Sequence, residues 1–241
     1  MRGIILSGGS GTRLRPLTKI TSKQLLPIYN RPMIYYPLNT LVQSGIKEIL
    51  IIVSPDRAGD YLNLLGSGRE FGVKFTYEIQ DKPEGLAQSF LIGEQFIGDD
   101  SVTMILGDNI FEDNFSEEII NFKRGAKVFA KRVKDPSRFG VVKFNNDMKA
   151  EKIVEKPDEF LSDYAVTGIY VCDNRVIRLA KSLKPSARGE LEITDLINKY
   201  LELDELEVAM VKGEWLDAGT FDSLFKAQIL AKEKLARKML F

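Results

Sequence analysis

Near the N-terminus the sequence reads Arg2-Gly3-Ile4-Ile5-Leu6-Ser7-Gly8-Gly9-Ser10-Gly11-Thr12-Arg13, and the prediction of the whole fold starts from these residues. The apolar run Ile4-Ile5-Leu6 is typical of a strand that is buried on both faces, as in a parallel sheet. Glycines follow at positions 8, 9 and 11. Because glycine has no Cβ, the backbone N–H groups of such a turn can approach a phosphate closely. The stretch therefore predicts a buried strand that leads into an anion-binding loop.

A glycine-rich turn on its own is equally typical of an ordinary tight turn. The loop is not a Walker A motif, because no Gly-Lys-Ser/Thr follows, and it lacks the Gly-x-Gly-x-x-Gly spacing of dinucleotide-binding proteins. Three cations favour the phosphate interpretation: Arg13 and Arg15 follow at once, and Lys23 lies a short way along the chain.

Strand-like and helix-like segments alternate through the first half of the chain. Strands are expected at 48–53, 74–79 and 102–106, and helices at 32–44, 56–65 and 86–96, with Asp56 as a helix cap. This alternation predicts an α/β fold with a Rossmann-like, doubly wound sheet that is mainly parallel and carries helices on both faces. Strands at 127–133, 140–144, 149–154, 164–172 and 207–211 then predict a smaller β-rich region, with helices at 175–183, 194–202 and 221–239.

Composition narrows the class of protein. The chain has 241 residues, which suits one α/β domain, and we find no repeat or linker in it. Lys and Arg together number 34, as do Asp and Glu, so bulk charge favours neither a nucleic acid nor a membrane as partner. No apolar run is long enough to span a membrane, and the N-terminus has no signal-peptide pattern. A single cysteine, Cys172, permits no internal disulfide, is expected to be buried, and fits the cytoplasm.

The absence of histidine restricts the chemistry further. It removes Ser-His-Asp and Cys-His catalysis and every histidine-ligated metal site. An enzyme with this sequence must work with carboxylates, lysine, arginine and a hard cation such as Mg²⁺.

The stretch 8–18, followed by Ser22-Lys23-Gln24-Leu25-Leu26-Pro27, resembles the signature of the sugar-1-phosphate nucleotidylyltransferases, and its Lys-Gln-Leu-Leu-Pro form is most similar to the glucose-1-phosphate thymidylyltransferases. The resemblance continues through most of the chain. Its further motifs are 77–80, 85–88, 106–109, 139–142, 155–157, 164–170, 187–195 and 215–220.

The resemblance implies a transfer of a thymidylyl group from dTTP to glucose 1-phosphate, with Mg²⁺ as cofactor. It also implies a single domain with three parts: a nucleotide-binding part at about 1–110, a sugar-phosphate-binding part at about 111–220 and a terminal helix at about 220–240. It implies nucleotide contacts at Leu6, Gly8, Gly9, Gly11, Thr12, Arg13, Lys23, Gln24, Gln80, Gly85 and Asp108. It implies sugar-phosphate contacts at Asn109, Gly140, Glu155, Lys156, Val166, Thr167 and Arg188, with Tyr170 close to the phosphates.

The catalytic residues implied by the resemblance are Arg13, Lys23, Asp108, Lys156 and Asp217, of which the two aspartates hold the metal. Without the resemblance, Asp108 is better interpreted as a turn or cap residue, and Asp217 could simply cap the last helix. Glu155 and Lys156 would be an exposed strand edge. We expect Trp215 mainly to pack in the core beside Asp217.

Two alternatives stay open at this point. One is an enzyme of the same fold that uses UTP, because thymine and uracil present the same edge to Gln24, Gln80 and the backbone near Gly85. The other is a non-catalytic sugar-nucleotide-binding protein of the same fold.

The chain departs from the family pattern in two places. Family members often carry tyrosine where this chain has Phe139, and many carry a C-terminal helical segment that builds a regulatory site. This chain therefore resembles a short form, in which we expect feedback inhibition to be weak or to act only at the active site. The resemblance also implies a homo-oligomer, either a dimer or a tetramer.

Overall fold

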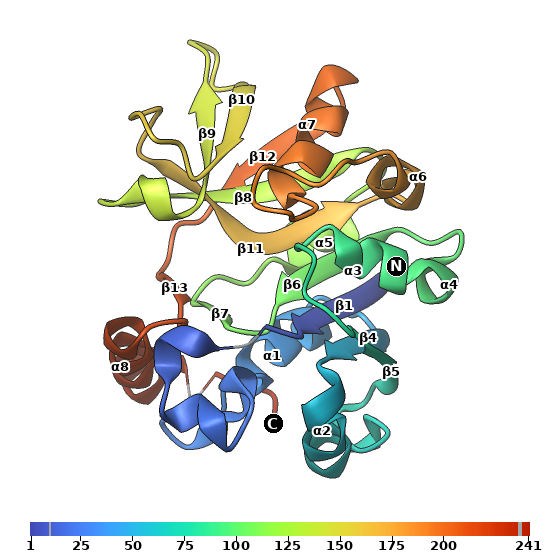
Figure 1. Ribbon diagram of the computed structural model, residues 1–241, viewed down its shortest axis with the longest axis vertical. Coiled ribbons are helices and arrows are strands. Elements are labelled where there is room, and N and C mark those ends of the chain that lie inside the picture. The colour runs from blue at the N-terminus through green and yellow to red at the C-terminus, as the bar shows by residue number, and fades with distance from the viewer. Residues whose placement is uncertain (10, 236–237) are drawn as a thin grey trace.

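A computed structural model describes residues 1–9, 11–235 and 238–241. Within these residues nine strands form one mixed sheet, in which β10, β9, β11, β6, β1, β4 and β5 follow one another, while β8 joins β11 to β12 (Figure 1). Its strands are β1 Arg2–Ser7, β4 Glu48–Val53, β5 Lys74–Ile79, β6 Val102–Leu106, β8 Ala126–Arg132, β9 Gly140–Phe144, β10 Ala150–Glu155, β11 Tyr164–Cys172 and β12 Leu206–Met210. Strands β6, β1, β4 and β5 are parallel, and β11 pairs antiparallel with β6, β8 and β9.

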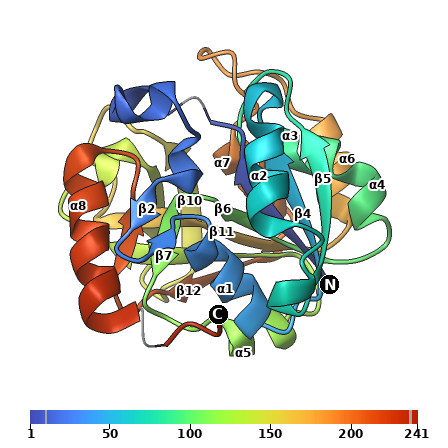
Figure 2. The same ribbon diagram turned by 90° about the horizontal axis from the view of Figure 1, so that it is seen from below.

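Helices cover both faces of the sheet, as the sequence predicts (Figures 1 and 2). They are α1 Tyr35–Gln43, α2 Ala58–Leu65, α3 Gln88–Ile92, α4 Glu94–Ile97, α5 Ser116–Ile120, α6 Arg175–Lys181, α7 Ile193–Glu202 and α8 Phe221–Leu230. Because successive strand residues point to opposite faces, Ile4 packs in the cluster that holds α3, α6 and α7, whereas Ile5 packs in the cluster that holds α1 and α2.

A third apolar cluster joins the two ends of the chain. Leu14 and Leu26 of the N-terminal segment pack there against Leu224 and Leu230 of α8. Short 3₁₀ turns shape this segment: η1 Thr12–Leu14, η2 Leu17–Lys19 and η3 Lys23–Leu25. The small pair β2 Pro27–Ile28 and β3 Arg31–Pro32 completes it. The loop after β1 is therefore held against the last helix.

The expectations for the helices at 56–65 and 86–96 are wrong in part. Asp56 lies inside the 3₁₀ turn Pro55–Arg57, and no side chain caps α2 at its N-cap, Arg57. The expected helix at 86–96 is divided at Gly93, because α3 ends and α4 begins there.

The terminal helix is shorter than the expected span of about 220–240. Regular α8 ends at Leu230, and a π-helical turn occupies Ala231–Leu235. Thr220 begins α8 through a capping box with Ser223. Positions 236–237 of the expected helix lie outside the described residues, and the last residues, 239–241, are not helical.

A second small sheet, which the sequence does not reveal, connects distant parts of the chain. Strand β7, Asn109–Phe111, pairs antiparallel with β13, Trp215–Asp217, so that Asp217 lies opposite Asn109. The backbone N–H of Ala218 also donates to the carbonyl of Asp108 at 2.9 Å. This pairing carries the segment around Asp217 to the carboxyl end of β6.

Candidate active site

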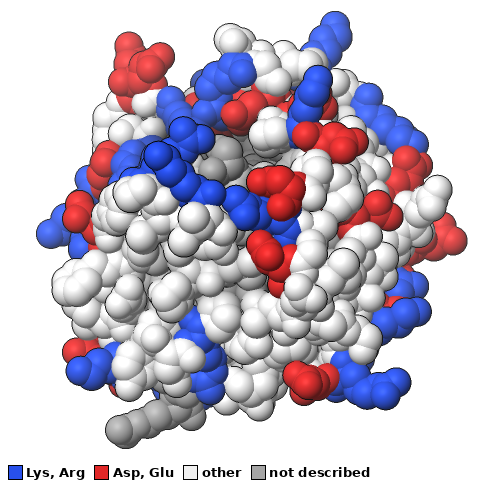
Figure 3. Space-filling model, turned by 60° about the horizontal axis from the view of Figure 1, so that its bottom comes forward, with Lys and Arg blue, Asp and Glu red and all other residues white. Residues whose placement is uncertain are grey.

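The carboxyl ends of the parallel strands open onto three adjoining cavities. The largest, about 570 Å³, lies beside Gly8, Gly9 and Lys23. A cavity of about 210 Å³ holds Gln24, Gln80 and Asp108, and one of about 130 Å³ holds Glu155 and Asp217. Figure 3 shows a hollow in this face that is bordered by both basic and acidic side chains. Ligands of open α/β sheets bind at this edge.

The loop after β1 needs glycine at two of its positions. Gly11 has φ +60°, and a Cβ there would lie 2.9 Å from Thr18 Cγ2. A Cβ on Gly8 would lie 2.0 Å from Gln80 Oε1. Thr18 holds the turn by donating its hydroxyl to the Gly11 carbonyl at 2.8 Å. The glycines therefore bring the backbone close to Gln80 and to the nearest cavity.

Lys23, Asp108, Asp217 and Arg13 form one charged cluster. The Lys23 ammonium donates to Asp108 Oδ2, and both side chains are largely buried. Burial would raise the pKa of Asp108, but the attraction of Lys23 outweighs it and holds that pKa below its usual range. A Cβ on Gly219 would lie 2.7 Å from Asp217 Oδ1 and 2.8 Å from Arg13 Nη2, so these two side chains converge on one point.

Asp217 differs from Asp108 in its ionisation. Burial and the negative charge of Asp108 both raise the pKa of Asp217, and the attraction of Lys23 and Arg13 offsets this only in part. Asp217 Oδ1 accepts a hydrogen bond from the Gly219 N–H at 2.9 Å. The protein thus holds two largely buried carboxylates that repel each other, and Lys23 and Arg13 only partly offset the effect of burial and repulsion on Asp217.

We expect Asp217→Asn to stabilise the metal-free protein at neutral pH by about 0.5–2 kcal/mol while it removes activity. Because the folded-state pKa of Asp217 lies above the unfolded value, its contribution to stability is fully present below the unfolded pKa and is lost as pH rises through the folded pKa. The uncharged amide avoids that loss. Urea unfolding in EDTA at neutral pH and below the ordinary Asp range measures the difference. A variant that is less stable than the wild type at neutral pH contradicts this account.

The donor set fits a hard divalent cation. Asp108 and Asp217 supply carboxylate oxygens, and Lys23 provides a cation in contact with Asp108. Among the described residues no three carboxylate or thiol side chains form a group that could hold a metal ion by themselves. Mg²⁺ typically takes one or two carboxylates together with substrate phosphates, so a pair of aspartates suffices.

The 210 Å³ cavity carries the residues expected to read a base. Leu6, Leu86 and Leu106 supply apolar surface, and the amides of Gln24 and Gln80 supply polar groups. Gly85 has φ +109°, and a Cβ there would lie 2.3 Å from the Leu191 carbonyl oxygen, so only glycine fits. A flat, partly apolar ring with a polar edge suits this cavity.

The 130 Å³ cavity combines Gly140, Val166 and Thr167 with Glu155 and Asp217. A Cβ on Gly140 would lie 2.7 Å from Thr194 Cγ2 and 3.4 Å from Glu155 Oε2, so any other residue at position 140 would crowd the lining of this cavity. The hydroxyls of Thr167 and Thr194 are buried and have no hydrogen-bond partner in the described part of the chain. Thr194, which we expected only to begin a helix, is thus a site residue that the sequence analysis missed.

Asn109 and Trp215 line this cavity and are joined by a hydrogen bond. Asn109 Oδ1 accepts from the Gly168 N–H at 3.0 Å and from Trp215 Nε1 at 2.7 Å, and its Nδ2 donates to Asp108 Oδ1 at 3.1 Å. Trp215 is buried, as expected, but it also lines the cavity and positions Asn109. Much of the Asn109 amide is therefore engaged within the protein, where it orients Asp108.

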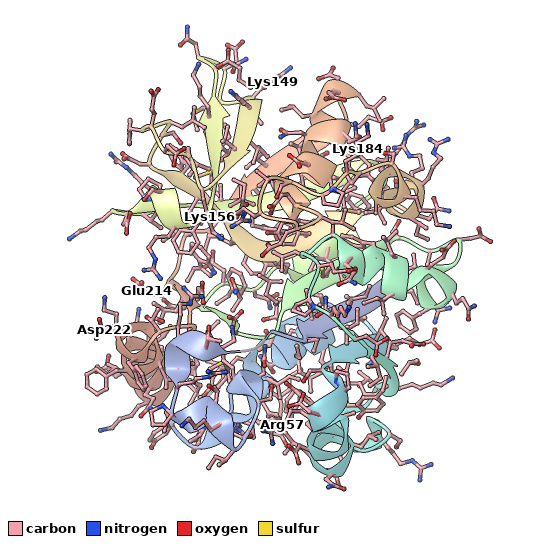
Figure 4. All side chains as sticks on the ribbon, in the orientation of Figure 1. Arg57, Lys149, Lys156, Lys184, Glu214 and Asp222 are labelled. Carbon is pink, nitrogen blue, oxygen red and sulfur yellow. The ribbon has the colours of Figure 1, made fainter. Side chains whose placement is uncertain are left out.

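Lys156 and Arg188 both lie close to Glu155, which lines the 130 Å³ cavity. Lys156, which is labelled in Figure 4, has φ +41°. Its Nζ lies 3.7 Å from Glu155 Oε1. The Arg188 guanidinium pairs with Glu192 at 2.7 Å and lies 3.6 Å from Glu155. Burial raises the pKa of Glu155, and the neighbouring Lys156 lowers it only in part. To contact a phosphate, Arg188 would have to give up its ion pair with Glu192 or its contact with Glu155.

Tyr170 and Cys172 lie on β11, and both are buried. Tyr170 lines the 130 Å³ cavity together with Glu155. Burial raises the pKa of the Cys172 thiol, so this cysteine is an inert core residue, as expected.

A family model described as nucleotidyl transferase matches residues 2–234, so the chain belongs to the nucleotidyl transferase family. Its fold and its three adjoining cavities agree with that class. Curated relatives identify the branch. The chain is 53% identical over 233 residues to a glucose-1-phosphate thymidylyltransferase of Neisseria meningitidis, covering 94% of this chain and 81% of the relative. It is 52% identical over 232 residues to that of Mycolicibacterium smegmatis, with the same coverage.

Solved structures agree with the fold. A Bacillus anthracis structure assigned to glucose-1-phosphate thymidylyltransferase, in complex with sucrose, superimposes with a TM-score of 0.92 at 51% identity, covering 97% of this chain and 96% of that one. A UDP-glucose pyrophosphorylase complexed with UDP-glucose gives 0.84 at 23% identity, covering 97% and 98%, and shows the fold alone. In the described part of the chain, no helix is long and apolar enough to cross a membrane.

Proposed function

We propose that this chain is a glucose-1-phosphate thymidylyltransferase, which makes dTDP-glucose and pyrophosphate from dTTP and α-D-glucose 1-phosphate. One observation carries the proposal. Asp108 lines the cavity of the base-reading glutamines, Asp217 lines the cavity of Glu155, and the two carboxylates interact with the same Lys23. The charged cluster therefore lies where a nucleoside triphosphate and a sugar phosphate would meet.

The proposed reaction is an in-line displacement at the α-phosphorus. A phosphate oxygen of the sugar 1-phosphate forms a new P–O bond, and the bond between the α-phosphorus and the oxygen that bridges to the β-phosphate breaks as pyrophosphate leaves. The attacking phosphate is largely dianionic at neutral pH, so no protein base is needed. This suits a chain without histidine.

The residues then have electrostatic roles. Arg13 and the backbone of Gly8, Gly9, Gly11 and Thr12 would hold the triphosphate. Lys23 would balance charge at the α-phosphate, and Lys156 with Arg188 would hold the sugar phosphate. Asn109, Gly140, Glu155, Val166 and Thr167 would surround the sugar.

Asp108 and Asp217 would hold Mg²⁺. When bound, the ion would neutralise phosphate charge between the two substrates. Lys23 already donates to Asp108, so it would keep that carboxylate ionised and oriented before the substrates arrive.

Residues 1–241 would form one nucleotidyltransferase domain, which would bind the nucleotide at about 1–110 and the sugar phosphate at about 111–220. The enzyme would be a homo-oligomer, either a dimer or a tetramer. Exposed apolar side chains on α8, among them Phe221, Phe225 and Ile229, support association with further copies. Light scattering of the purified protein measures the number of copies. We place the enzyme in the cytoplasm, where its substrates would be available.

A pyrophosphate-release assay over a grid of nucleoside triphosphates and sugar 1-phosphates tests the function. We expect dTTP with glucose 1-phosphate to be preferred, UTP to be accepted, and CTP, ATP and GTP to be poor substrates. The thymine methyl group adds only about 1 kcal/mol of apolar burial, so the margin over UTP should be modest. A strong UTP preference would favour the uridylyltransferase alternative, and no turnover with any pair would favour the non-catalytic one.

Gln80→Ala should raise KM for dTTP and narrow the margin over CTP. An unpaired polar group at the base edge costs about 1–3 kcal/mol, which is roughly ten- to hundredfold in kcat/KM. Steady-state kinetics with both nucleotides measure the change. An unchanged dTTP-to-CTP ratio would remove Gln80 from base reading.

The acid limb of the pH–rate profile should follow the substrate. Because the chain has no histidine, the limb should report the second ionisation of the sugar phosphate and metal binding. A phosphonate analogue with a different pKa should move the limb. A limb that stays in place would instead point to Glu155 or Asp217, the two site carboxyls whose pKa values are raised.

A further inference from the structure

Gln80 lies in the wall between the two cavities on the nucleotide side. It follows β5 directly, is 4% exposed, and lines both the 570 Å³ and the 210 Å³ cavity. A terminal amide has one accepting oxygen and one donating NH₂ group, and the two ends recognise opposite features of a base. Which end faces the nucleotide therefore decides which base edge is accepted.

Gln88, in the first turn of α3, has only one orientation that satisfies its neighbour Glu84. The backbone N–H of Glu84 donates to Gln88 Oε1 at 3.1 Å, and Gln88 Nε2 donates to the Glu84 carboxylate at 2.9 Å. An N–H can only donate and an ionised carboxylate can only accept, so turning the Gln88 amide over would break both bonds.

The backbone of Glu84 is itself fixed. The Leu191 N–H donates to the Glu84 carbonyl at 2.7 Å, and the Ala87 N–H donates to the Leu191 carbonyl at 3.2 Å. These two bonds hold the turn that contains Gly85. The donor and acceptor that orient Gln88 thus come from one turn, whose backbone is anchored.

Gln88 in turn orients Gln80. Gln80 Nε2 donates to Gln88 Oε1 at 2.7 Å. Because Gln88 presents only its oxygen to this partner, Gln80 must present its NH₂ group and leave its own oxygen for the cavity. Gln80 Oε1 lies close above Gly8 and has no hydrogen-bond partner in the described parts of the chain, 1–9, 11–235 and 238–241.

Gln24, on the other side of the same cavity, has no comparable constraint. Its Oε1 accepts from the Ser22 hydroxyl at 2.8 Å and from the Tyr61 hydroxyl at 3.2 Å. Hydroxyls can donate or accept, so this pair tolerates either orientation of the Gln24 amide. The fixed polarity of the cavity therefore comes from the Gln80 side.

We propose that Gln88, held by Glu84, is a positioning residue for base specificity, because it fixes Gln80 with its oxygen toward the nucleotide. This inference rests on the proposed function. An accepting oxygen pairs with the N3–H of thymine or uracil. Cytosine has an accepting N3 at that place, so its nitrogen and the Gln80 oxygen would face each other without a proton between them. Gln88 thus excludes cytosine without touching the base.

Three variants separate this role from simple support of the fold. Gln88→Leu removes the acceptor and frees the Gln80 amide to turn. Gln88→Lys replaces the acceptor with a donor, which favours the reversed Gln80 amide. In the double variant Glu84→Gln/Gln88→Glu, residue 88 again presents an acceptor to Gln80, and residue 84 donates to it. Glu94→Gln is the matched control, since Glu94 lies on α4 and pairs with Lys181 away from the cavity.

The readout is the ratio of kcat/KM for dTTP to that for CTP. We expect Gln88→Leu and Gln88→Lys to lower this ratio by about ten- to hundredfold, with the larger change for lysine. The exchanged pair and the Glu94 control should stay near the wild-type ratio. Melting temperatures, with thymidine and cytidine nucleotides added separately, provide the same comparison without turnover and reveal any unfolded variant.

Equal losses with both nucleotides, or an unchanged ratio in Gln88→Lys, would overturn the proposal and leave Gln88 a structural residue. Failure of the proposed function looks different, because the wild-type protein itself would then produce no dTDP-glucose and bind no thymidine nucleotide. A low ratio in the exchanged pair would also contradict the proposal, since the acceptor is retained there.

Discussion

Asp108→Asn should lower turnover by about three powers of ten or more while the protein remains folded. The change keeps the shape of the side chain but removes the charge that would bind Mg²⁺ at the junction of the two cavities. It also leaves Lys23 without the carboxylate that it contacts. Pyrophosphate release measures the activity, and circular dichroism verifies the fold.

Two further measurements make this prediction specific. EDTA should abolish the wild-type reaction, and added Mg²⁺ should restore it. Asp60→Asn, the same chemical change at an exposed position on α2, should have no comparable effect. Full activity in EDTA, or an Asp108→Asn protein with normal turnover, would refute the assignment of the metal to this site.

Lys23→Met should reduce both activity and stability. Burial lowers the pKa of Lys23, but the charge and hydrogen bond of Asp108 and the charge of Asp217 together outweigh burial and raise that pKa above 10.5. The contribution of Lys23 to stability is therefore fully present at neutral pH and is lost only as pH rises through the raised value. Without Lys23, two buried carboxylates face each other. Breaking a buried pair in this way costs about 3–5 kcal/mol, and losing one transition-state charge costs about a hundred- to thousandfold in kcat.

The measurement is urea unfolding with and without Mg²⁺. Because Mg²⁺ would replace the missing positive charge, it should stabilise Lys23→Met more than the wild type. Lys47→Met, a matched change at an exposed position just before β4, should behave like the wild type. If Mg²⁺ stabilised the two proteins equally, Lys23 would not share its carboxylates with the metal.

Much of the central sheet could be predicted from local pattern. The expected strands at 48–53, 74–79 and 102–106 coincide with β4, β5 and β6, and those at 140–144 and 164–172 coincide with β9 and β11. Buried strands are short apolar runs, and apolar runs are visible in any sequence. Gly11 is likewise explained locally, by its φ of +60° and by its close neighbour Thr18, whereas the need for glycine at position 8 comes from the distant Gln80.

Elements that depend on partners far along the chain were not predicted. Strands β7 and β13 have three residues each, which is too short for a periodic pattern, and each exists because the other pairs with it. The hydrogen bond from Trp215 to Asn109 joins residues 106 positions apart. The π-helical turn after Leu230 was not predicted either.

The sequence by itself determined the α/β class, the glycine-rich loop and the residue types available for catalysis, because these follow from local chain geometry and from composition. The tertiary structure alone decided how those residues act. It set the opposite ionisation tendencies of Asp108 and Asp217, the approach of Arg188 to Glu155, and the orientation of Gln80 by Gln88. Charge and hydrogen-bond polarity depend on distances between side chains and on the exclusion of water, and folding brings those side chains together.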